Sequence, residues 1–236
     1  MERVLNQLVE KLRKAHGESL VSVVLYGSAA AGDHHGRFSD LNGFCVLKQI
    51  TPAELKASAP IFRWWRERGN PSPLLMSEDE VKTSTDCFPI EFHDMQARHK
   101  VLYGVDVLAG LVVDYVFYRA QVEHELRAKL LRLRQKAAGV LSDNDLLLKL
   151  LEESISTFAT LFRHALRLAG FEAQWQKRDV MRGAAEGFGI DPAPFATLLD
   201  LREERLKPRD TEPSRLFESY LKQIQVVIDA VDRLER

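Results

Sequence analysis

The chain has 236 residues, of which 45% are hydrophobic and 28% are charged, and its formal net charge is −1. These values exclude a long disordered chain and are typical of a globular protein with one large or two modest cores. The near-zero net charge argues against a dedicated nucleic-acid or membrane-surface binder, so we expect a small-molecule substrate. No apolar run approaches the roughly 18 residues of a spanning helix, and the charged start lacks a secretion signal, so we expect a cytoplasmic protein.

The chain begins with a pattern typical of an amphipathic helix. Val4, Leu5, Leu8, Val9 and Leu12 recur at helical spacing, and Gly17 follows as a stop signal. We therefore predict a helix over residues 2–15 that packs its apolar stripe on a sheet.

A short strand and a glycine turn come next. Residues 21–26 form an apolar, β-branched run that ends abruptly at Gly27 and Ser28. Residues 29–31 are alanines, which favour a helical turn, so we expect backbone amides near Gly27 and Ser28 to face a phosphate. After a polar loop, Asp40 and Asn42 lead into a second apolar run, and in a strand these two side chains share one face.

The following segment alternates helix and strand signals. Thr51 and Pro52 open a predicted helix that runs to about Arg68, residues 74–76 form a brief strand, and Ser77 starts a capping box. Residues 88–94 are then predicted to be extended, because Glu91 alternates with two apolar neighbours. A carboxylate at that position would face a polar environment.

From about residue 106 onward the pattern is helical, with breaks at glycine and proline clusters. We predict helices over about 106–138, 143–169, 174–187, 192–206 and 213–235. The second has apolar residues at the spacing of a bundle's central helix, and Ser142 or Asp143 would cap it.

The run Leu25-Tyr26-Gly27-Ser28, the spacer, and Ser39-Asp40-Leu41 resemble the nucleotidyltransferase superfamily that includes DNA polymerase beta and the aminoglycoside adenylyltransferases. The resemblance implies an α/β (α+β) domain with a small mixed sheet at residues 1–105. The helical pattern from residue 106 onward predicts a helical bundle at 106–236, and we expect a cleft between the two domains.

In that family Gly27 and Ser28 would hold a nucleoside triphosphate, and Mg²⁺ or Mn²⁺ would be bound by Asp40, Asn42 and Glu91. Glu91 would lie near the acceptor hydroxyl as metal ligand and base, with Asp94 as the alternative third acid. The acceptor would be a small hydroxyl compound that the sequence does not name. The chain departs from the family at Asn42, where the second acid of the Asp-x-Asp motif is expected.

Two other functions stay open at this stage. The first is a nucleotide-binding or interaction module that kept the fold but lost the reaction, since Asn42 offers a neutral oxygen without charge. The second is a ribonuclease, because Arg119 and His124 match the loose Arg-x4-6-His pattern of HEPN-type enzymes. The basic stretch at 127–136 lacks aromatic residues and favours a solvated face, so nucleic acid is not an expected partner. The oligomeric state is open between monomer and homodimer.

Overall fold

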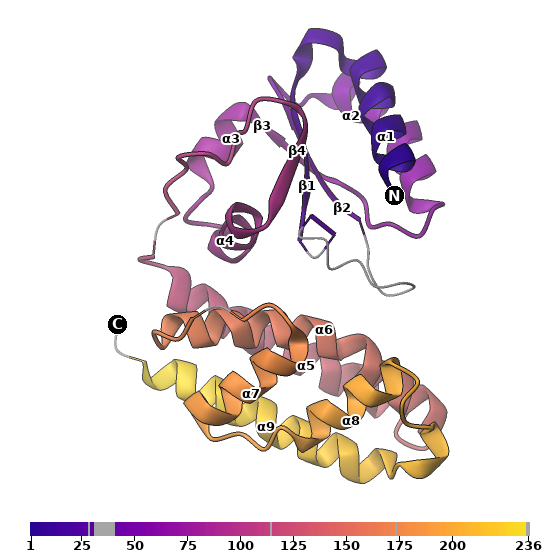
Figure 1. The fold of residues 1–236 in the computed structure, drawn as a ribbon, viewed down its shortest axis with the longest axis vertical. Helices are drawn as coiled ribbons and strands as arrows, with labels where there is room; N and C mark the ends of the chain where they lie inside the picture. The colour runs from indigo at the N-terminus through magenta and orange to yellow at the C-terminus, as the bar shows by residue number, and fades with distance from the viewer. Residues whose placement is uncertain (28, 31–40, 114, 173, 235–236) are drawn as a thin grey trace. The chain divides into compact units, whose positions relative to one another are not determined.

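The computed structural model describes residues 1–236 except 28, 31–40, 114, 173 and 235–236. The chain divides into two compact units, Met1–Phe117 and Tyr118–Arg236 (Figure 1). The division lies after Phe117, whereas we predicted it after residue 105, so the segment 106–117 belongs to the first unit.

One mixed sheet of four strands forms the centre of the first unit, in the order β3-β2-β1-β4. Its strands are β1 (Leu20–Tyr26), β2 (Asn42–Leu47), β3 (Leu74–Ser77) and β4 (His99–Gly104). β1 is antiparallel to both of its neighbours, and β2 is parallel to β3. This small mixed sheet, followed by a helical unit, confirms the predicted fold class.

Helices cover both faces of the sheet (Figure 1). α1 (Glu2–His16), which is followed by the short η1 (Gly17–Ser19), and α2 (Pro52–Arg66) pack on one face, while α3 (Glu78–Thr83) and α4 (Pro89–Ala97) pack on the other. Side chains alternate along β1 accordingly, so Val23 and Leu25 face α1 and α2, and Val24 faces α4. The predicted helix at 2–15 is confirmed.

The predicted caps of α2 and α3 are also confirmed. The Thr51 hydroxyl accepts a hydrogen bond from the Ala53 amide, and Glu54 accepts one from the Thr51 amide. Ser77 and Glu80 form the same reciprocal pair at α3. These bonds satisfy amides that a helix start otherwise leaves without partners.

The prediction of an extended segment at 88–94 is wrong, because these residues enter α4. Pro89 occupies the first turn of that helix, where its missing amide costs nothing. Phe92 and Met95, three residues apart, are both fully buried against the sheet. The alternation around Glu91 was too short to distinguish the two periods, and packing of the Phe92 and Met95 side chains favours the helix.

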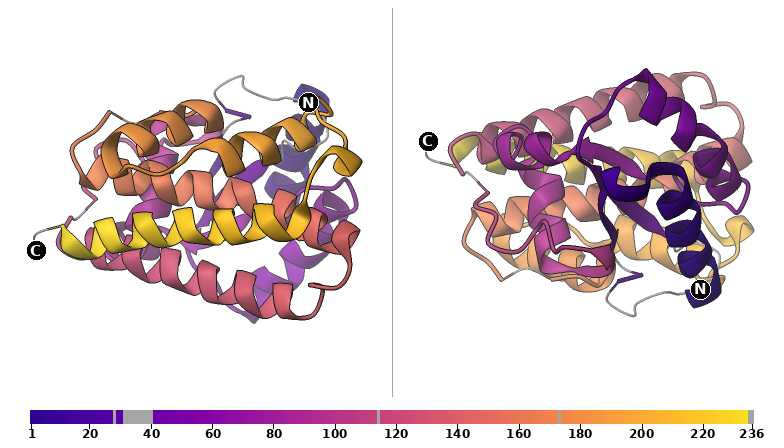
Figure 2. Two further views of the ribbon diagram at one scale, coloured as in Figure 1. Left: turned by 90° about the horizontal axis from the view of Figure 1, so that it is seen from below. Right: turned by 90° about the horizontal axis from the view of Figure 1, so that it is seen from above.

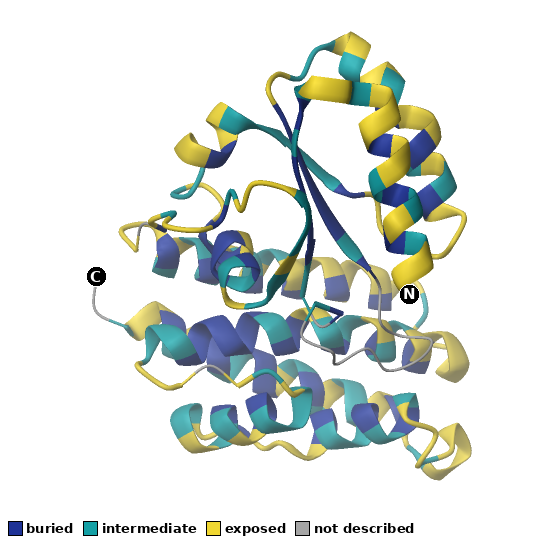
Figure 3. Ribbon diagram, turned by 45° about the horizontal axis from the view of Figure 1, so that its top comes forward, coloured by how far each residue is buried: buried dark blue, intermediate teal, exposed yellow. Residues whose placement is uncertain are grey.

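The second unit is helical. It contains α5 (Tyr118–Ala138), α6 (Asn144–Leu168), α7 (Lys177–Phe188), α8 (Ala193–Arg202), the short η3 (Pro208–Asp210) and α9 (Pro213–Arg233). α6 contacts all four other α-helices of this unit and is largely buried, as predicted for the central helix (Figures 2 and 3). Asp143 caps it by accepting hydrogen bonds from the amides of Asp145 and Leu146.

The first predicted helix of this unit starts twelve residues later than expected, at Tyr118 instead of about residue 106. Gly110, with φ of +72°, adopts a left-handed backbone that interrupts any helix over this segment. In the part of the chain that the structure describes, no helix combines the length and the apolar character needed to cross a membrane.

Candidate active site

One end of the sheet gathers polar side chains in a row. Tyr26, the last residue of β1, pairs with Asn42 of β2 on one side and with His99 of β4 on the other. Paired residues point to the same face of a sheet. Val24, two residues before Tyr26, faces α4. Asn42, Tyr26 and His99 therefore lie at one level on the face that α4 covers.

Two carboxylates of α4 lie near this row. Glu91 and Asp94 are three residues apart, a spacing that places them on the same side of a helix. Burial, followed by the charges of Glu91 and then Asp94, raises the pKa of the Tyr26 phenol to about 12. In the predicted strand, an odd spacing would have separated the two acids, so the helix brings to Tyr26 two groups that we had treated as alternatives.

Gly27 lies beside Asn42 at a position where a side chain would be crowded. Its φ is +80°, and a Cβ at this position would lie 3.2 Å from Nδ2 of Asn42. Its amide donates a hydrogen bond of 3.0 Å to the Arg98 carbonyl, so this N–H is already occupied and does not serve a phosphate as we expected. What glycine supplies here is a left-handed turn and close approach to Asn42.

Ser28 and Asp40, both predicted site residues, lie outside the described residues. The chain just after Asp40 is fixed, since the Leu41 amide donates a 3.2 Å hydrogen bond to Oδ1 of Asn70. Leu41 itself is buried. Asn42 therefore enters β2 from a defined position at the level of Tyr26.

The donor chemistry near Tyr26 fits a hard divalent cation. Carboxylate oxygens of Glu91 and Asp94 and the amide oxygen of Asn42 belong to the ligand types that Mg²⁺ prefers. Among the described residues, no three histidine, cysteine or acidic side chains form a metal-binding group, and Asp40 is not among those residues. The fit therefore rests on the kind of donor atoms rather than on a complete ligand set.

A cluster of cations in the second unit was missed by sequence reasoning. Arg163 of α6 is only 9% exposed, and its guanidinium lies 4.2 Å from the ring centroid of Trp175. Arg202 donates to Ser156 Oγ at 2.7 Å. Burial, and then the charges of Arg202 and Arg163, lower the pKa of Lys177 even though Glu203 opposes them.

Lys177 makes no hydrogen bond or ion pair with any described residue. Burial and the two neighbouring arginines disfavour the charged form of this lysine, and Glu203 offsets part of that effect. No local pattern reveals this group, because its members come from α6, α7 and α8, which are far apart in the sequence.

The ribonuclease pattern has a structural explanation. Arg119 Nη1 donates to Glu123 Oε2 at 2.9 Å, and Glu123 also accepts from Arg127 Nε at 2.8 Å. The Arg119 side chain is mostly buried and is held by this ion pair within α5. Arg119 therefore has a structural role on the surface of α5.

We expect neutralisation of the α4 acids to lower the Tyr26 pKa. In the variant carrying Glu91→Gln and Asp94→Asn, burial remains, so the pKa should fall below about 12 without returning fully to the usual value. The measurement is the tyrosinate absorbance near 295 nm as a function of pH, taken as the difference from Tyr26→Phe. A pKa that does not move would place both carboxylates away from Tyr26.

The same shift predicts how stability depends on pH. Because folding raises the pKa of this acid, the unfolded chain loses its proton first, and stability falls as pH rises from about 10 to about 12. The expected loss reaches about 2 kcal/mol in urea unfolding. Tyr26→Phe should lack this contribution, so equal losses in both proteins would contradict the assignment.

Comparisons with known proteins find solved structures of low similarity, among them the two that follow. No protein-family model and no curated protein matches the chain. The spectinomycin adenyltransferase AAD(9) from Enterococcus faecialis, crystallised with ATP and spectinomycin, shares 11% identity over 98% of this chain and 99% of its own, with a TM-score of 0.49. A toxin–antitoxin structure with AMP-PNP shares 16% identity over 50% of this chain and 92% of its own, with a TM-score of 0.34. Both TM-scores are below 0.5, a level at which similarity carries no argument about the site or its activity.

Proposed function

We propose that the protein is a nucleotidyltransferase that transfers a nucleoside monophosphate from a triphosphate to the hydroxyl of a small acceptor. The observations that support this most are the pairing of Asn42 with Tyr26 beside Gly27 and the action of the charges of the two α4 acids on Tyr26. Phosphoryl-type transfer needs oxygen donors and a close approach of phosphate to backbone, and this end of the sheet offers both.

Each residue has a distinct part in the proposal. Gly27 leaves room beside Asn42 for a phosphate, and Ser28 offers a hydroxyl to it. Glu91 accepts the proton of the acceptor hydroxyl, and Asp94, on the same side of α4, is the alternative. Asp40, Asn42 and Glu91 would hold Mg²⁺ or Mn²⁺, which when bound supplies positive charge to the phosphate oxygens.

Asn42 makes the proposed activity weak. An amide can bind a cation through its oxygen but lacks the negative charge that a carboxylate contributes. The competing proposal is a nucleotide-binding module of the same fold without the reaction. Such a module would bind nucleotide as a slow enzyme does but would not transfer the nucleoside monophosphate.

Calorimetric titration with ATP, GTP and CTP, each with Mg²⁺ or Mn²⁺, tests whether the site binds nucleotide. Glu91→Gln and Asp94→Asn, tested separately, identify the third acid by the larger loss of metal-dependent affinity. Pyrophosphate release in the presence of candidate hydroxyl compounds then separates enzyme from module. Absence of binding for all three nucleotides would reject both.

We also propose an anion-binding role for the second unit, which rests on Lys177, a half-buried lysine that makes no hydrogen bond or ion pair with any described residue. We expect Lys177→Met to weaken binding of inorganic tripolyphosphate about tenfold, because a charge-assisted hydrogen bond is lost. The apo protein should at the same time melt about 1–3 °C higher, since burial and two neighbouring arginines disfavour the charged lysine.

Lys149→Met is the matched control, because Lys149 is exposed on α6. It should change neither affinity nor melting temperature. A Lys177→Met protein that melts higher but binds tripolyphosphate normally would leave the cluster without a role in anion binding.

A further inference from the structure

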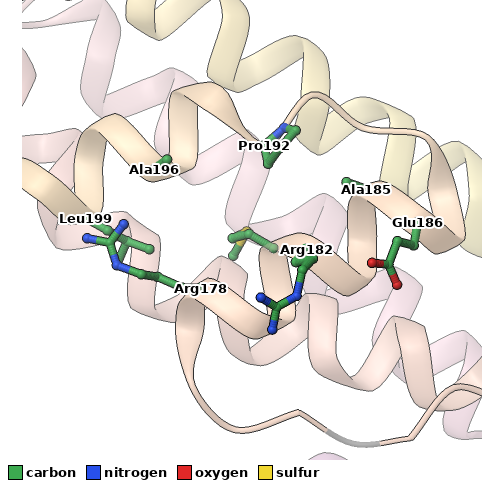
Figure 4. Close-up of a pocket in the computed structure, with 8 residues that line it drawn as sticks. Arg178, Arg182, Ala185, Glu186, Pro192, Ala196 and Leu199 are labelled. Atoms are coloured by element: carbon green, nitrogen blue, oxygen red, sulfur yellow. The ribbon is translucent and has the colours of Figure 1, made fainter.

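The second unit contains a cavity of about 460 Å³ between α7 and α8 (Figure 4). Met181 and Leu199, both almost fully buried, contribute to its apolar wall. Ala185 and Ala196 also line it, and their small side chains leave the space open. The volume lies within the range of natural small-molecule sites, which is about 300–1,000 Å³.

The two helices that form this cavity are held in place. On the opposite side of α7, a Cβ at Gly183 would lie 3.2 Å from Leu166, and one at Gly187 would lie 2.9 Å from Phe171. Close packing therefore fixes α7 against α6 and against the residues that follow α6. The cavity is thus preformed and does not depend on a ligand to separate the helices.

Ion pairs fix one end of the cavity. Arg178 Nη2 donates to Asp200 Oδ1 at 2.7 Å and to Glu203 Oε2 at 2.8 Å, so this arginine ties α7 to α8. Arg182, on the next turn of α7, pairs with Asp179. Both arginines at the rim are therefore matched by carboxylates.

Glu186 differs from these rim residues. It lies at the other end of the cavity (Figure 4), is exposed, and makes no hydrogen bond or ion pair with any residue that the structure describes. Glu203 also pairs with Arg205, so Asp179, Asp200 and Glu203 are balanced by three arginines, and the charge of Glu186 alone is unmatched by any described residue. This charge favours a cation.

We propose that the cavity between α7 and α8 binds a small molecule with an apolar body and one ammonium group, the body against Met181 and Leu199 and the ammonium at Glu186. All residues of this site belong to the second unit, and none is among the residues assigned to nucleotide transfer. The inference therefore stands independently of the proposed function.

Three ligands of one shape test the charge preference: 4-phenylbutylamine, 4-phenylbutanol and 4-phenylbutyrate. In calorimetric titrations of the full chain at pH 7, the amine should bind most tightly, the alcohol about two- to fivefold more weakly, and the acid most weakly. This factor is typical of one exposed ion pair. Equal affinities, a tighter acid or no binding up to millimolar ligand would overturn the proposal.

Two variants place the ligand in the cavity. Glu186→Gln should bring the affinity for the amine down to that for the alcohol, whereas Glu172→Gln, an exposed control in the same unit, should leave the preference intact. Ala196→Phe fills the cavity and should weaken binding of all three ligands at least about tenfold. If a folded Ala196→Phe protein binds the amine as tightly as the wild type does, the binding site is not this cavity. If Ala196→Phe does not fold, the loss of the amine preference in Glu186→Gln tests the proposal instead.

Discussion

Gly27→Val should abolish nucleotide binding and lower the free energy of unfolding by about 1–3 kcal/mol. The stability loss has a backbone origin, because the φ of +80° at Gly27 lies in a region that β-branched residues rarely adopt. The binding loss has a separate origin. A Cβ 3.2 Å from Nδ2 of Asn42, enlarged by two methyl groups, occupies the space that the proposal assigns to a phosphate.

Gly69→Val separates these two effects. Gly69 has nearly the same φ, +81°, but no atom lies within 4 Å of the position its Cβ would take. Both variants should therefore lose stability in urea unfolding, Gly27→Val somewhat more because its side chain also meets Asn42, while only Gly27→Val loses nucleotide affinity in calorimetry. If a folded Gly27→Val protein keeps its nucleotide affinity, the phosphate does not bind at this turn.

A gentler variant guards against unfolding. Gly27→Ala adds a single methyl group, which meets the end of the Asn42 side chain rather than backbone. Combining it with Asn42→Ala removes that contact, so the two substitutions should be coupled in a double-mutant cycle of stability. Additive effects would indicate that Gly27 and Asn42 do not approach each other.

Local signals in the sequence predicted the elements whose ends are fixed by neighbouring residues. Thr51, Ser77 and Asp143 cap helices through hydrogen bonds that span two or three residues, and these were recognisable from the sequence. β1 and β2 were recognisable from apolar runs that end at Gly27 or begin after Asn42. Both kinds of signal are complete within about six residues.

Other features depend on contacts that the sequence does not display. α4 forms because Phe92 and Met95 both reach the core on one face of the sheet, a fact of tertiary packing. The left-handed backbone at Gly110 breaks the helix that we predicted from residue 106, and α5 begins only at Tyr118. The cation cluster around Lys177 needs three helices to meet.

The candidate site shows the same division. The position of Gly27 and the alternation that brings Asn42 to its level were predictable, because both lie beside a recognisable strand. The joint action of Asp94 and Glu91 on Tyr26 could not be predicted from the sequence, because it depends on the helical period of α4. The hydrogen bond from the Gly27 amide to Arg98 joins residues 71 positions apart and leaves no local signal.

Asn42→Asp should raise both Mg²⁺ affinity in the presence of nucleotide and any nucleotide transfer. Loss of one preorganised group that stabilises a transition state typically costs 10²–10³-fold in rate, or about 3–4 kcal/mol, so restoring the carboxylate should recover a gain of about that size. The substitution keeps the side-chain size. Asn42 is half-buried at the start of β2, so the fold should tolerate the change.

The new charge also has a cost without metal. The carboxylate introduced by Asn42→Asp would face the acids that already raise the pKa of Tyr26, and like charges in one site destabilise each other. The apo variant should therefore melt at a lower temperature than the wild type, and Mg²⁺ with nucleotide should reverse the difference. Asn70→Asp is the matched control, because Asn70 bonds the Leu41 amide and would gain the same charge without entering the row of Asn42, Tyr26 and His99.

The pattern of outcomes separates the two proposals for this protein. A gain in metal affinity together with transfer in Asn42→Asp identifies an impaired enzyme, whose remaining groups are already placed for the reaction. A gain in metal affinity alone identifies a binding module, because charge is then restored to a site that lacks some other catalytic group. Wild-type transfer as fast as that of Asn42→Asp would show that the Asn42 amide suffices as a ligand. The carboxylates of Glu91 and Asp94, which lie on one side of α4 and whose charges both act on Tyr26, would then supply the charge that the motif lacks.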